Sequence, residues 1–184
     1  YALTDQSKPV FVGEYANLRS QLDYDYHTFY NEERQLLHDS LINIFHDTIV
    51  VDTDNNLTCD HPLENWMVFT AGAMGAGKGF TMKYLASQGL FPKDAFVQVD
   101  PDALRELLPE TNEYVKIDPT TAGYLTQKEV GFIAETLTLD ALSDGKNVLV
   151  DGSLRNAEWY ANYIQDLHNK FPKMKFAIIH VTAK

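Results

Sequence analysis

Residues 66–80 read Trp-Met-Val-Phe-Thr-Ala-Gly-Ala-Met-Gly-Ala-Gly-Lys-Gly-Phe, and this stretch decides the fold. Its apolar start, 66–71, is typical of a buried strand, and a helix is predicted over 78–88. The residues between fit the pattern G-x-x-x-x-G-K. A glycine-rich loop that leads from a strand into a helix points successive backbone N–H groups at a phosphate, which its lysine also reaches. The residues predicted to contact a nucleotide are Gly72, Ala73, Met74, Gly75, Ala76, Gly77, Lys78, Gly79 and Phe80.

Apolar runs and helical patterns alternate along the rest of the chain. The predicted strands are 66–71, 95–99, 147–150 and 175–181, and the further predicted helices are 103–108, 127–142 and 156–170. Continuous apolar strands that alternate with helices are typical of a parallel sheet covered on both faces. The sequence therefore predicts an α/β fold, the three-layer P-loop NTPase fold with a mostly parallel sheet. Its ligand is expected at the carboxyl ends of the strands.

The first third of the chain differs from the rest. Residues 1–27 are polar and rich in tyrosine, and 29–47 are predicted to form an amphipathic helix. Residues 52–60 superficially resemble a calcium-binding loop but lack its glycine, so we predict a polar connecting loop. We expect an N-terminal helical extension over 1–62 and a P-loop core over 63–184. The apolar face of the first helix is expected to hold Leu37, Leu41, Ile44 and Phe45.

Composition limits the possible functions. The chain has 184 residues, a net charge of −11 and one cysteine, Cys59, which excludes an internal disulfide framework. The acidic balance argues against a nucleic-acid partner, since such proteins need basic surface to neutralise phosphates. No apolar run has the length of a membrane span, and residues 1–20 carry no secretory signal. We expect a cytoplasmic protein with no nucleic-acid or membrane partner, and the start at Tyr1 suggests a fragment.

Polar side chains follow the second and third predicted strands, on the same rim of the sheet as the glycine-rich loop. Asp100 and Asp102 follow the second strand, where a carboxylate could accept the proton of an attacking hydroxyl or could cap the next helix. Asp151 follows the third strand, where an acid could hold Mg²⁺ or could simply form a turn. Ser153 and Arg155 come next, and an arginine there could clamp substrate oxygens or lie in solvent.

From residue 67 to residue 183 the chain resembles the zeta toxin family of P-loop kinases. The stretches that carry this resemblance are 72–78, 99–104, 108–110, 120–129, 134–135 and 150–155. Bacterial members of that family use ATP and Mg²⁺ to phosphorylate a sugar hydroxyl of UDP-N-acetylglucosamine. The resemblance thus implies a kinase of a small hydroxyl compound, with ATP and Mg²⁺ as its cofactors.

The resemblance also implies roles for matching residues. Lys78 would contact the ATP phosphates, and Asp102 would be the general base. Glu135, Ser153 and Arg155 would bind the acceptor, and the acid near the metal would be Asp151. The position after Lys78 departs from the family, because Gly79 replaces a metal-binding Ser or Thr. The family's C-terminal lid, with its arginines, lies beyond Lys184, so we expect this chain to bind nucleotide but to phosphorylate slowly or not at all.

Two other functions stay open from the sequence. The Gly-Lys-Gly sequence at residues 77–79 also occurs in adenylate kinases, which suggests a nucleoside-monophosphate kinase. Such an enzyme needs several arginines for the acceptor phosphate, and this chain has only Arg19, Arg34, Arg105 and Arg155. The other alternative is a non-catalytic module whose binding to a partner depends on nucleotide. An antitoxin-like protein partner is compatible with the resemblance, but no residue points to one.

Overall fold

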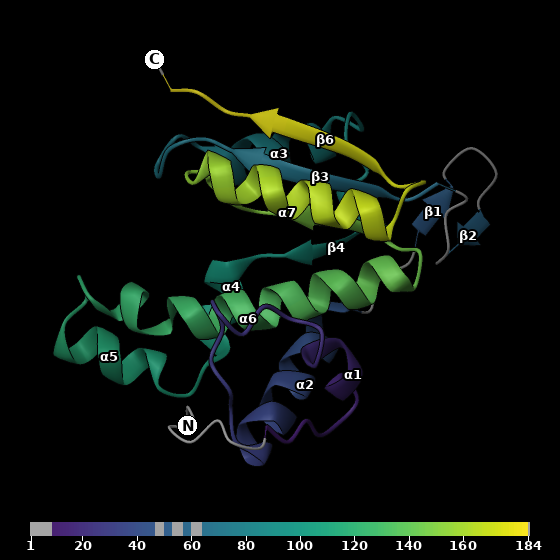
Figure 1. Ribbon diagram of the computed structural model, residues 1–184. Coiled ribbons are helices and arrows are strands. Elements are labelled where there is room, and N and C mark those ends of the chain that lie inside the picture. Colours follow the sequence, from purple (N-terminus) through teal and green to yellow (C-terminus); the bar gives the residue numbers. More distant parts are fainter. Residues whose placement is uncertain (1–8, 47–49, 53–56, 60–63, 184) are drawn as a thin grey trace. The chain divides into compact units, whose positions relative to one another are not determined.

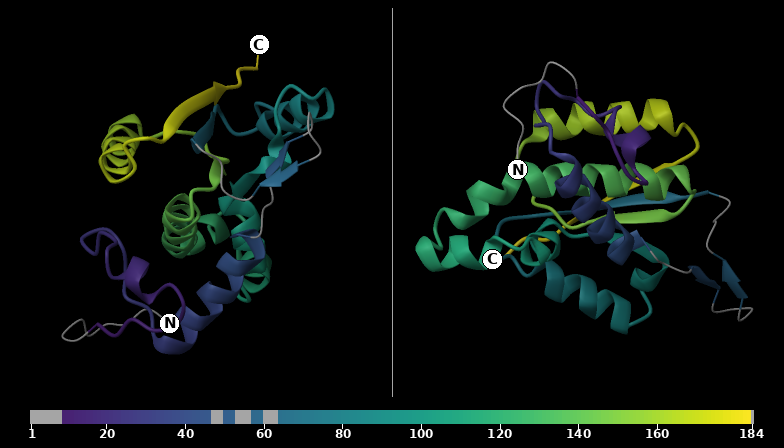
Figure 2. Two further views of the ribbon diagram at one scale, coloured as in Figure 1. Left: turned by 90° about the vertical axis from the view of Figure 1, so that its right-hand side faces the viewer. Right: turned by 90° about the horizontal axis from the view of Figure 1, so that it is seen from below.

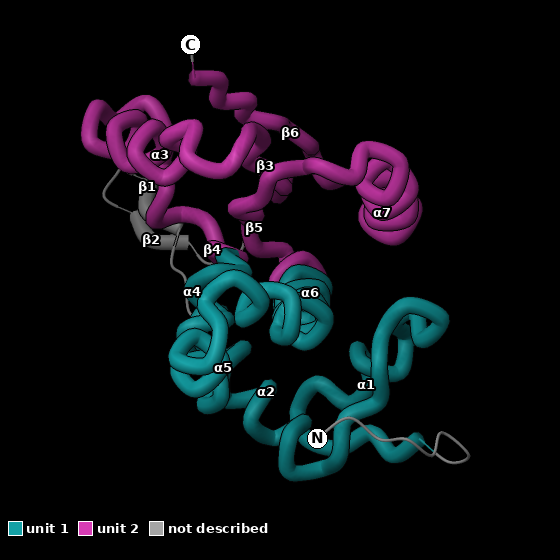
Figure 3. Tube along the Cα trace, turned by 90° about the vertical axis from the view of Figure 1, so that its left-hand side faces the viewer, with its two compact units in different colours: residues 1–46, 100–140 teal, residues 47–99, 141–184 magenta. Residues whose placement is uncertain are grey.

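The computed structural model describes residues 9–46, 50–52, 57–59 and 64–183 (Figure 1). The chain divides into two compact units, each treated by itself (Figure 3). Residues 47–99 and 141–184 form the first, which we call the sheet unit. Residues 1–46 and 100–140 form the second, which we call the helical unit. Within the described ranges, no helix combines the length and the apolar composition that crossing a membrane needs.

The sheet unit is built on four parallel strands in the order β4-β5-β3-β6. These strands are β3 (Trp66–Ala71), β4 (Phe96–Val99), β5 (Asn147–Val150) and β6 (Lys175–His180). The bounds predicted for β3 and β5 are confirmed, and the other two strands differ from prediction by one residue at one end. The inner strands are apolar because both faces of the sheet are covered, and Met67, Phe69 and Val148 are fully buried.

Helices cover the two faces of this sheet. Helix α3 (Lys78–Ser87) and helix α7 (Ala157–Lys170) lie on opposite sides of it (Figure 3). The side chain of Val68 belongs to one cluster with Met82 of α3, whereas the ring of Phe69 meets Tyr160 of α7 edge-on at 6.0 Å. The α/β fold with a parallel sheet flanked by helices is therefore as predicted. A short 3-10 helix, η1 (Lys93–Ala95), precedes β4.

The sheet unit also contains a small second sheet that the sequence did not predict. Strands β1 (Val50–Asp52) and β2 (Leu57–Cys59) pair antiparallel, with Val50 opposite Cys59. The expected connecting loop over 52–60 is therefore wrong at residues 52 and 57–59, because the polar residues between them hid two short runs that favour strands. The remaining part of that expectation, residues 53–56 and 60, lies outside the described residues.

The helical unit holds α1 (Ala16–Arg19), α2 (Glu32–His46), α4 (Pro101–Leu107), α5 (Thr111–Ile117) and most of α6 (Ala122–Ser143) (Figures 1 and 2). Helices α1 and α5 were not predicted. Helix α6 begins at Ala122 rather than at Gln127. The side chain of Asp118 explains this earlier start, because it accepts a hydrogen bond from the backbone N–H of Thr120 at 2.9 Å and fixes the turn before the helix.

The buried face of α2 is polar, which corrects the predicted apolar face. Leu41 is buried as expected, but the side chain of Ile44 is 63% exposed. Four of the six buried residues of this helix carry polar or charged side chains. They are Arg34, Gln35, His38, Asp39, Leu41 and Ile42. Apolar periodicity could not locate this face, because hydrogen bonds rather than apolar contacts fill most of it.

Candidate functional site

The glycine-rich loop lies at the carboxyl end of β3 and leads into α3. Gly72 has a φ of 141°, and a Cβ atom there would lie 2.3 Å from the carbonyl oxygen of Val181. Gly77, directly before the helix, has a left-handed backbone with a φ of 85°. Both positions therefore require glycine, one for close packing of two backbones and one for conformation. The loop joins a strand to the N-terminus of a ten-residue helix, which is the context that the sequence pattern predicted.

Lys78 folds back over this loop. Its Nζ atom donates hydrogen bonds to the carbonyl oxygens of Gly72, at 3.1 Å, and Ala73, at 3.3 Å. Its ammonium group is thus held against the backbone that would surround a phosphate. Met74 of the loop and Phe80 of α3 point to solvent, with 98% and 77% of their surfaces exposed.

Asp151 lies beside the loop, at the carboxyl end of β5, the strand next to β3. The hydroxyl of Thr70 donates to Asp151 Oδ1 at 2.6 Å and accepts from the backbone N–H of Gly152 at 3.1 Å. The backbone N–H of Gly72 donates to the carbonyl oxygen of Ser153 at 3.4 Å. These bonds tie residues 151–153 to the base of the loop, as the strand order predicts. Sequence reasoning missed Thr70, although a polar residue inside an apolar strand was a visible signal.

Ser153 and Arg155 follow Asp151 in an irregular segment. Leu154 between them has a φ of 49°, a left-handed backbone that costs free energy for a residue with a side chain. Ser153 and Arg155 are both exposed, and Arg155 forms no ion pair with a described residue. The segment thus presents an exposed guanidinium near the loop end of the sheet. Asn156 then caps α7 by accepting from the backbone N–H of Trp159 at 3.2 Å.

Asp102 and Glu135 belong to the helical unit. Asp100 caps α4 by accepting from the backbone N–H groups of Asp102, at 2.9 Å, and Ala103, at 3.2 Å. The capping alternative thus applies to Asp100. Asp102 has an exposed carboxylate, which forms an ion pair with Arg105 one turn later. Arg105 is held in turn by the hydroxyl of Thr126, 2.9 Å from its Nε atom.

Glu135 lies on α6 and binds a histidine from the N-terminal segment. The Nε2 atom of His27 lies 2.8 Å from Glu135 Oε2. The side chain of His27 is 2% exposed and that of Glu135 is 20% exposed. Sequence reasoning missed this pair, because the two residues lie 108 positions apart and no local pattern connects them.

A second carboxylate of α6, Glu129, lies in a buried network. Arg34 donates to both oxygens of Glu110, at 2.9 and 2.8 Å, and also to both oxygens of Glu129. His38 Nε2 lies 2.7 Å from Glu129 Oε1. Burial favours the protonated acid, but the hydrogen bonds from His38 and Arg34 outweigh it and hold the pKa of Glu129 at about 2. Burial lowers the pKa of His38 despite this partner.

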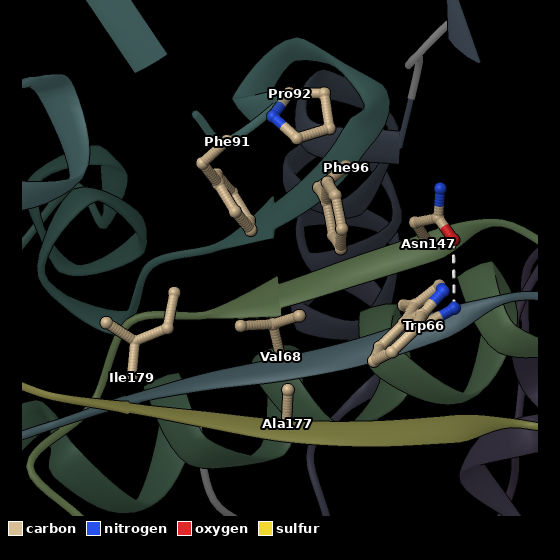
Figure 4. A pocket seen from close by; sticks show the side chains of 8 residues that line it. All are labelled: Trp66, Val68, Phe91, Pro92, Phe96, Asn147, Ala177 and Ile179. Atoms are coloured by element: carbon tan, nitrogen blue, oxygen red, sulfur yellow. Dashed lines mark hydrogen bonds between the residues drawn. The ribbon is translucent and has the colours of Figure 1, made fainter. Parts of the chain in front are cut away.

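A cavity of about 380 Å³ lies on the α3 side of the sheet (Figure 4). Its lining is apolar except for Asn147, whose Oδ1 accepts from the backbone N–H of Trp66 at 2.8 Å and whose Nδ2 donates to the carbonyl oxygen of Ala95 at 3.2 Å. Because both polar atoms of this side chain are used, the cavity offers no chemistry of its own. The lining residues are Trp66, Val68, Phe91, Pro92, Phe96, Asn147, Ala177 and Ile179.

Known structures support the fold. The chain is similar to a structure described as the PezAT chromosomal toxin-antitoxin system of the human pathogen Streptococcus pneumoniae, with a TM-score of 0.61 and 20% sequence identity. The match covers 82% of this chain and 58% of the pneumococcal chain, so this protein spans little more than half the length of that relative. None of the curated proteins matches the chain. The family model described as zeta toxin matches residues 50–184, and the chain therefore belongs to the zeta toxin family of kinase-like, nucleotide-binding P-loop proteins.

Proposed function

We propose that this protein is an ATP-dependent kinase that transfers the γ-phosphoryl group to a hydroxyl of a small molecule, such as the nucleotide sugar UDP-N-acetylglucosamine. The observation that carries the proposal is the loop over 72–77, with Lys78 folded onto its backbone at the carboxyl end of β3. A lysine in that place acts as a point charge toward the β and γ phosphates. Residues 72–80 are the proposed nucleotide contacts.

The residues beside the loop fit Mg²⁺. One oxygen of Asp151 accepts from Thr70, and its other oxygen has no partner among the described residues. Gly79 supplies no hydroxyl, but Mg²⁺ commonly keeps several waters and needs only one or two carboxylates besides phosphate oxygens. We therefore propose Asp151 as the metal-binding acid. A bound Mg²⁺ would neutralise charge on the phosphate oxygens.

Family membership supports a proposal for the acceptor side of the reaction. Asp102 would accept the proton of the acceptor hydroxyl. The hydroxyl oxygen would then bond to the γ-phosphorus while the bond from that phosphorus to ADP breaks. Glu135, Ser153 and Arg155 would orient the acceptor. Lys78 would stabilise the charge that moves onto the leaving phosphate.

The state of the arginines favours a hydroxyl acceptor over a nucleoside monophosphate. A monophosphate acceptor needs free guanidinium groups around its phosphate. Three of the four arginines already bind carboxylates: Arg19 pairs with Asp39, Arg34 with Glu110 and Glu129, and Arg105 with Asp102. Only Arg155 forms no ion pair with a described residue. Phosphorylation of AMP in preference to UDP-N-acetylglucosamine would instead favour a nucleoside-monophosphate kinase.

We propose residues 1–62 as an N-terminal extension of a kinase core over 63–184. Because the similar pneumococcal structure is that of a toxin-antitoxin system, we include an antitoxin-like protein among the proposed partners of this chain.

Calorimetric titration with ATP, with and without Mg²⁺, tests the nucleotide site. We expect micromolar binding that Mg²⁺ strengthens, and at least a tenfold loss in Lys78→Ala, since a hydrogen-bonded charge contributes about 1.5–3 kcal/mol. Lys83→Ala removes an exposed lysine from the same helix and should change nothing. Equal binding by Lys78→Ala and Lys83→Ala would overturn the assignment of the loop.

A further inference from the structure

We propose that His27 is a positioning residue of the acceptor site, holding one oxygen of Glu135 so that the other can accept a hydrogen bond from the acceptor. The segment before α2 would then belong to the functional site. This inference rests on the proposed role of Glu135 in binding the acceptor.

His27 is itself firmly held by its neighbours. Its ring meets Phe132 of α6 edge-on, with the two centroids 5.4 Å apart, and it meets Tyr26 in the same way at 5.0 Å. Tyr24 lies on the neighbouring turn, and its hydroxyl donates to the carbonyl oxygen of Arg19 at 2.9 Å. A side chain fixed by packing can orient its partner with little further loss of entropy.

The two glutamates of α6, Glu129 and Glu135, differ in how many of their oxygens are bound. Both oxygens of Glu129 are taken, by Arg34 and His38. Among the described residues Glu135 is bound through Oε2 alone, and its side chain keeps 20% of its surface in contact with solvent. Glu129 is therefore a structural carboxylate, whereas Glu135 keeps an oxygen for another molecule.

The surroundings of His27 determine which of its ring nitrogens donates to Glu135. Its Nδ1 atom is buried and has no hydrogen-bond partner among the described residues. A buried N–H group without a partner is costly, so the ring proton belongs on Nε2, where it donates to Glu135. This hydrogen bond fixes the carboxylate in space.

The negative charge of the Glu135 carboxylate determines the kind of group that it can bind. Burial raises the pKa of Tyr24 to about 12, and the nearby negative charge of Glu135 adds to this effect. The three arginines of the helical unit already pair with carboxylates and would not offset a second anion. The group at Glu135 is therefore a hydrogen-bond donor such as a sugar hydroxyl or an amide N–H, and not a phosphate or a carboxylate.

Calorimetric titration of the whole chain with UDP-N-acetylglucosamine, in saturating ADP, tests this inference. We expect His27→Leu to weaken binding about tenfold, as the loss of a hydrogen bond to a charged group predicts. His27→Gln, which keeps an N–H donor near the same place, should restore most of the affinity. Glu135→Gln should weaken binding at least as much, and none of the three variants should alter ATP affinity. His38→Gln is the matched control, because it changes the histidine that binds Glu129 and should lower the melting temperature without changing sugar affinity.

The outcomes separate this inference from the proposed function. Weak binding by Glu135→Gln together with unchanged binding by His27→Leu would overturn the role of His27 alone. Unchanged binding by both variants, or wild-type protein that binds ATP but not the sugar, would overturn the proposed acceptor site and the inference with it. Equal losses in His27→Gln and His27→Leu, with circular dichroism showing both folded, would also count against a positioning hydrogen bond.

Discussion

The two units of this protein are stabilised in different ways. The sheet unit buries aliphatic and aromatic side chains, and Met67, Val97 and Val148 have no exposed surface. The helical unit buries charge as well: Arg19 and His38 are fully buried and Arg34 is 5% exposed. Apolar contacts are not directional and tolerate small shifts, whereas buried charges need partners in fixed positions. The difference makes the helical unit the part more sensitive to single substitutions and to acid.

Removal of the Glu129 carboxylate should cause the largest loss in the free energy of unfolding. In Glu129→Gln the buried His38 loses its carboxylate partner, and the buried Arg34 loses one of its two while keeping Glu110. Breaking a buried pair costs about 3–5 kcal/mol. Urea unfolding followed by circular dichroism measures the change. The control is Glu113→Gln, which breaks an exposed pair with Lys116 whose side chains are 67% and 70% exposed. That change should cost less than about 1 kcal/mol.

Similar losses in the free energy of unfolding for Glu129→Gln and Glu113→Gln would contradict the view that buried charge stabilises the helical unit. The helical unit would then owe its stability to its apolar contacts, such as those of Phe132, rather than to the network around Glu129.

Lowering the pH should have the second-largest effect on stability, and it should destabilise the helical unit first. The folded pKa of Glu129 is about 2 against an ordinary value of 4.5, so its contribution is complete above pH 4.5 and is lost as pH falls toward 2. The pKa of His38 lies below its ordinary 6.5, so the unfolded chain takes up that proton first and stability already falls below pH 6.5. The loss from Glu129 is on the order of 2–3 kcal/mol.

Amide hydrogen exchange from pH 7 down to about pH 2.5, corrected for the intrinsic pH dependence of exchange, measures this effect residue by residue. Protection should fall around Phe132 before it falls around Val97, and Glu129→Gln should reduce the pH dependence below 4.5. Equal loss of protection at both places would show that the acid sensitivity is not confined to the helical unit.

The same contrast explains what could be predicted from the sequence. Runs of apolar residues located the bounds of β3 and β5, because a strand buried on both faces must be apolar along its whole length. The glycine pattern located the loop, since Gly72 and Gly77 have backbones that other residues avoid. Contacts between distant polar side chains leave no such local pattern. The pair His27 and Glu135 and the polar face of α2 were therefore visible only in the structure.

The smallest expected effect on stability comes from a polar contact inside the sheet unit. It tests whether a buried polar group in this mostly apolar unit serves function or stability. Thr70 is fully buried, and its hydroxyl holds Asp151. Thr70→Val keeps the shape of the side chain but removes this bond, which should cost about 1 kcal/mol of stability. If Asp151 is the metal-binding acid, the gain in ATP affinity on adding Mg²⁺ should shrink severalfold while binding without Mg²⁺ stays the same. Calorimetry with and without Mg²⁺ measures both quantities, with Thr81→Val, a threonine of α3, as the control. A stability loss with an unchanged Mg²⁺ effect would make Thr70 a purely structural contact. Its hydrogen bond would then stabilise the sheet unit in the way that buried polar contacts stabilise the helical unit.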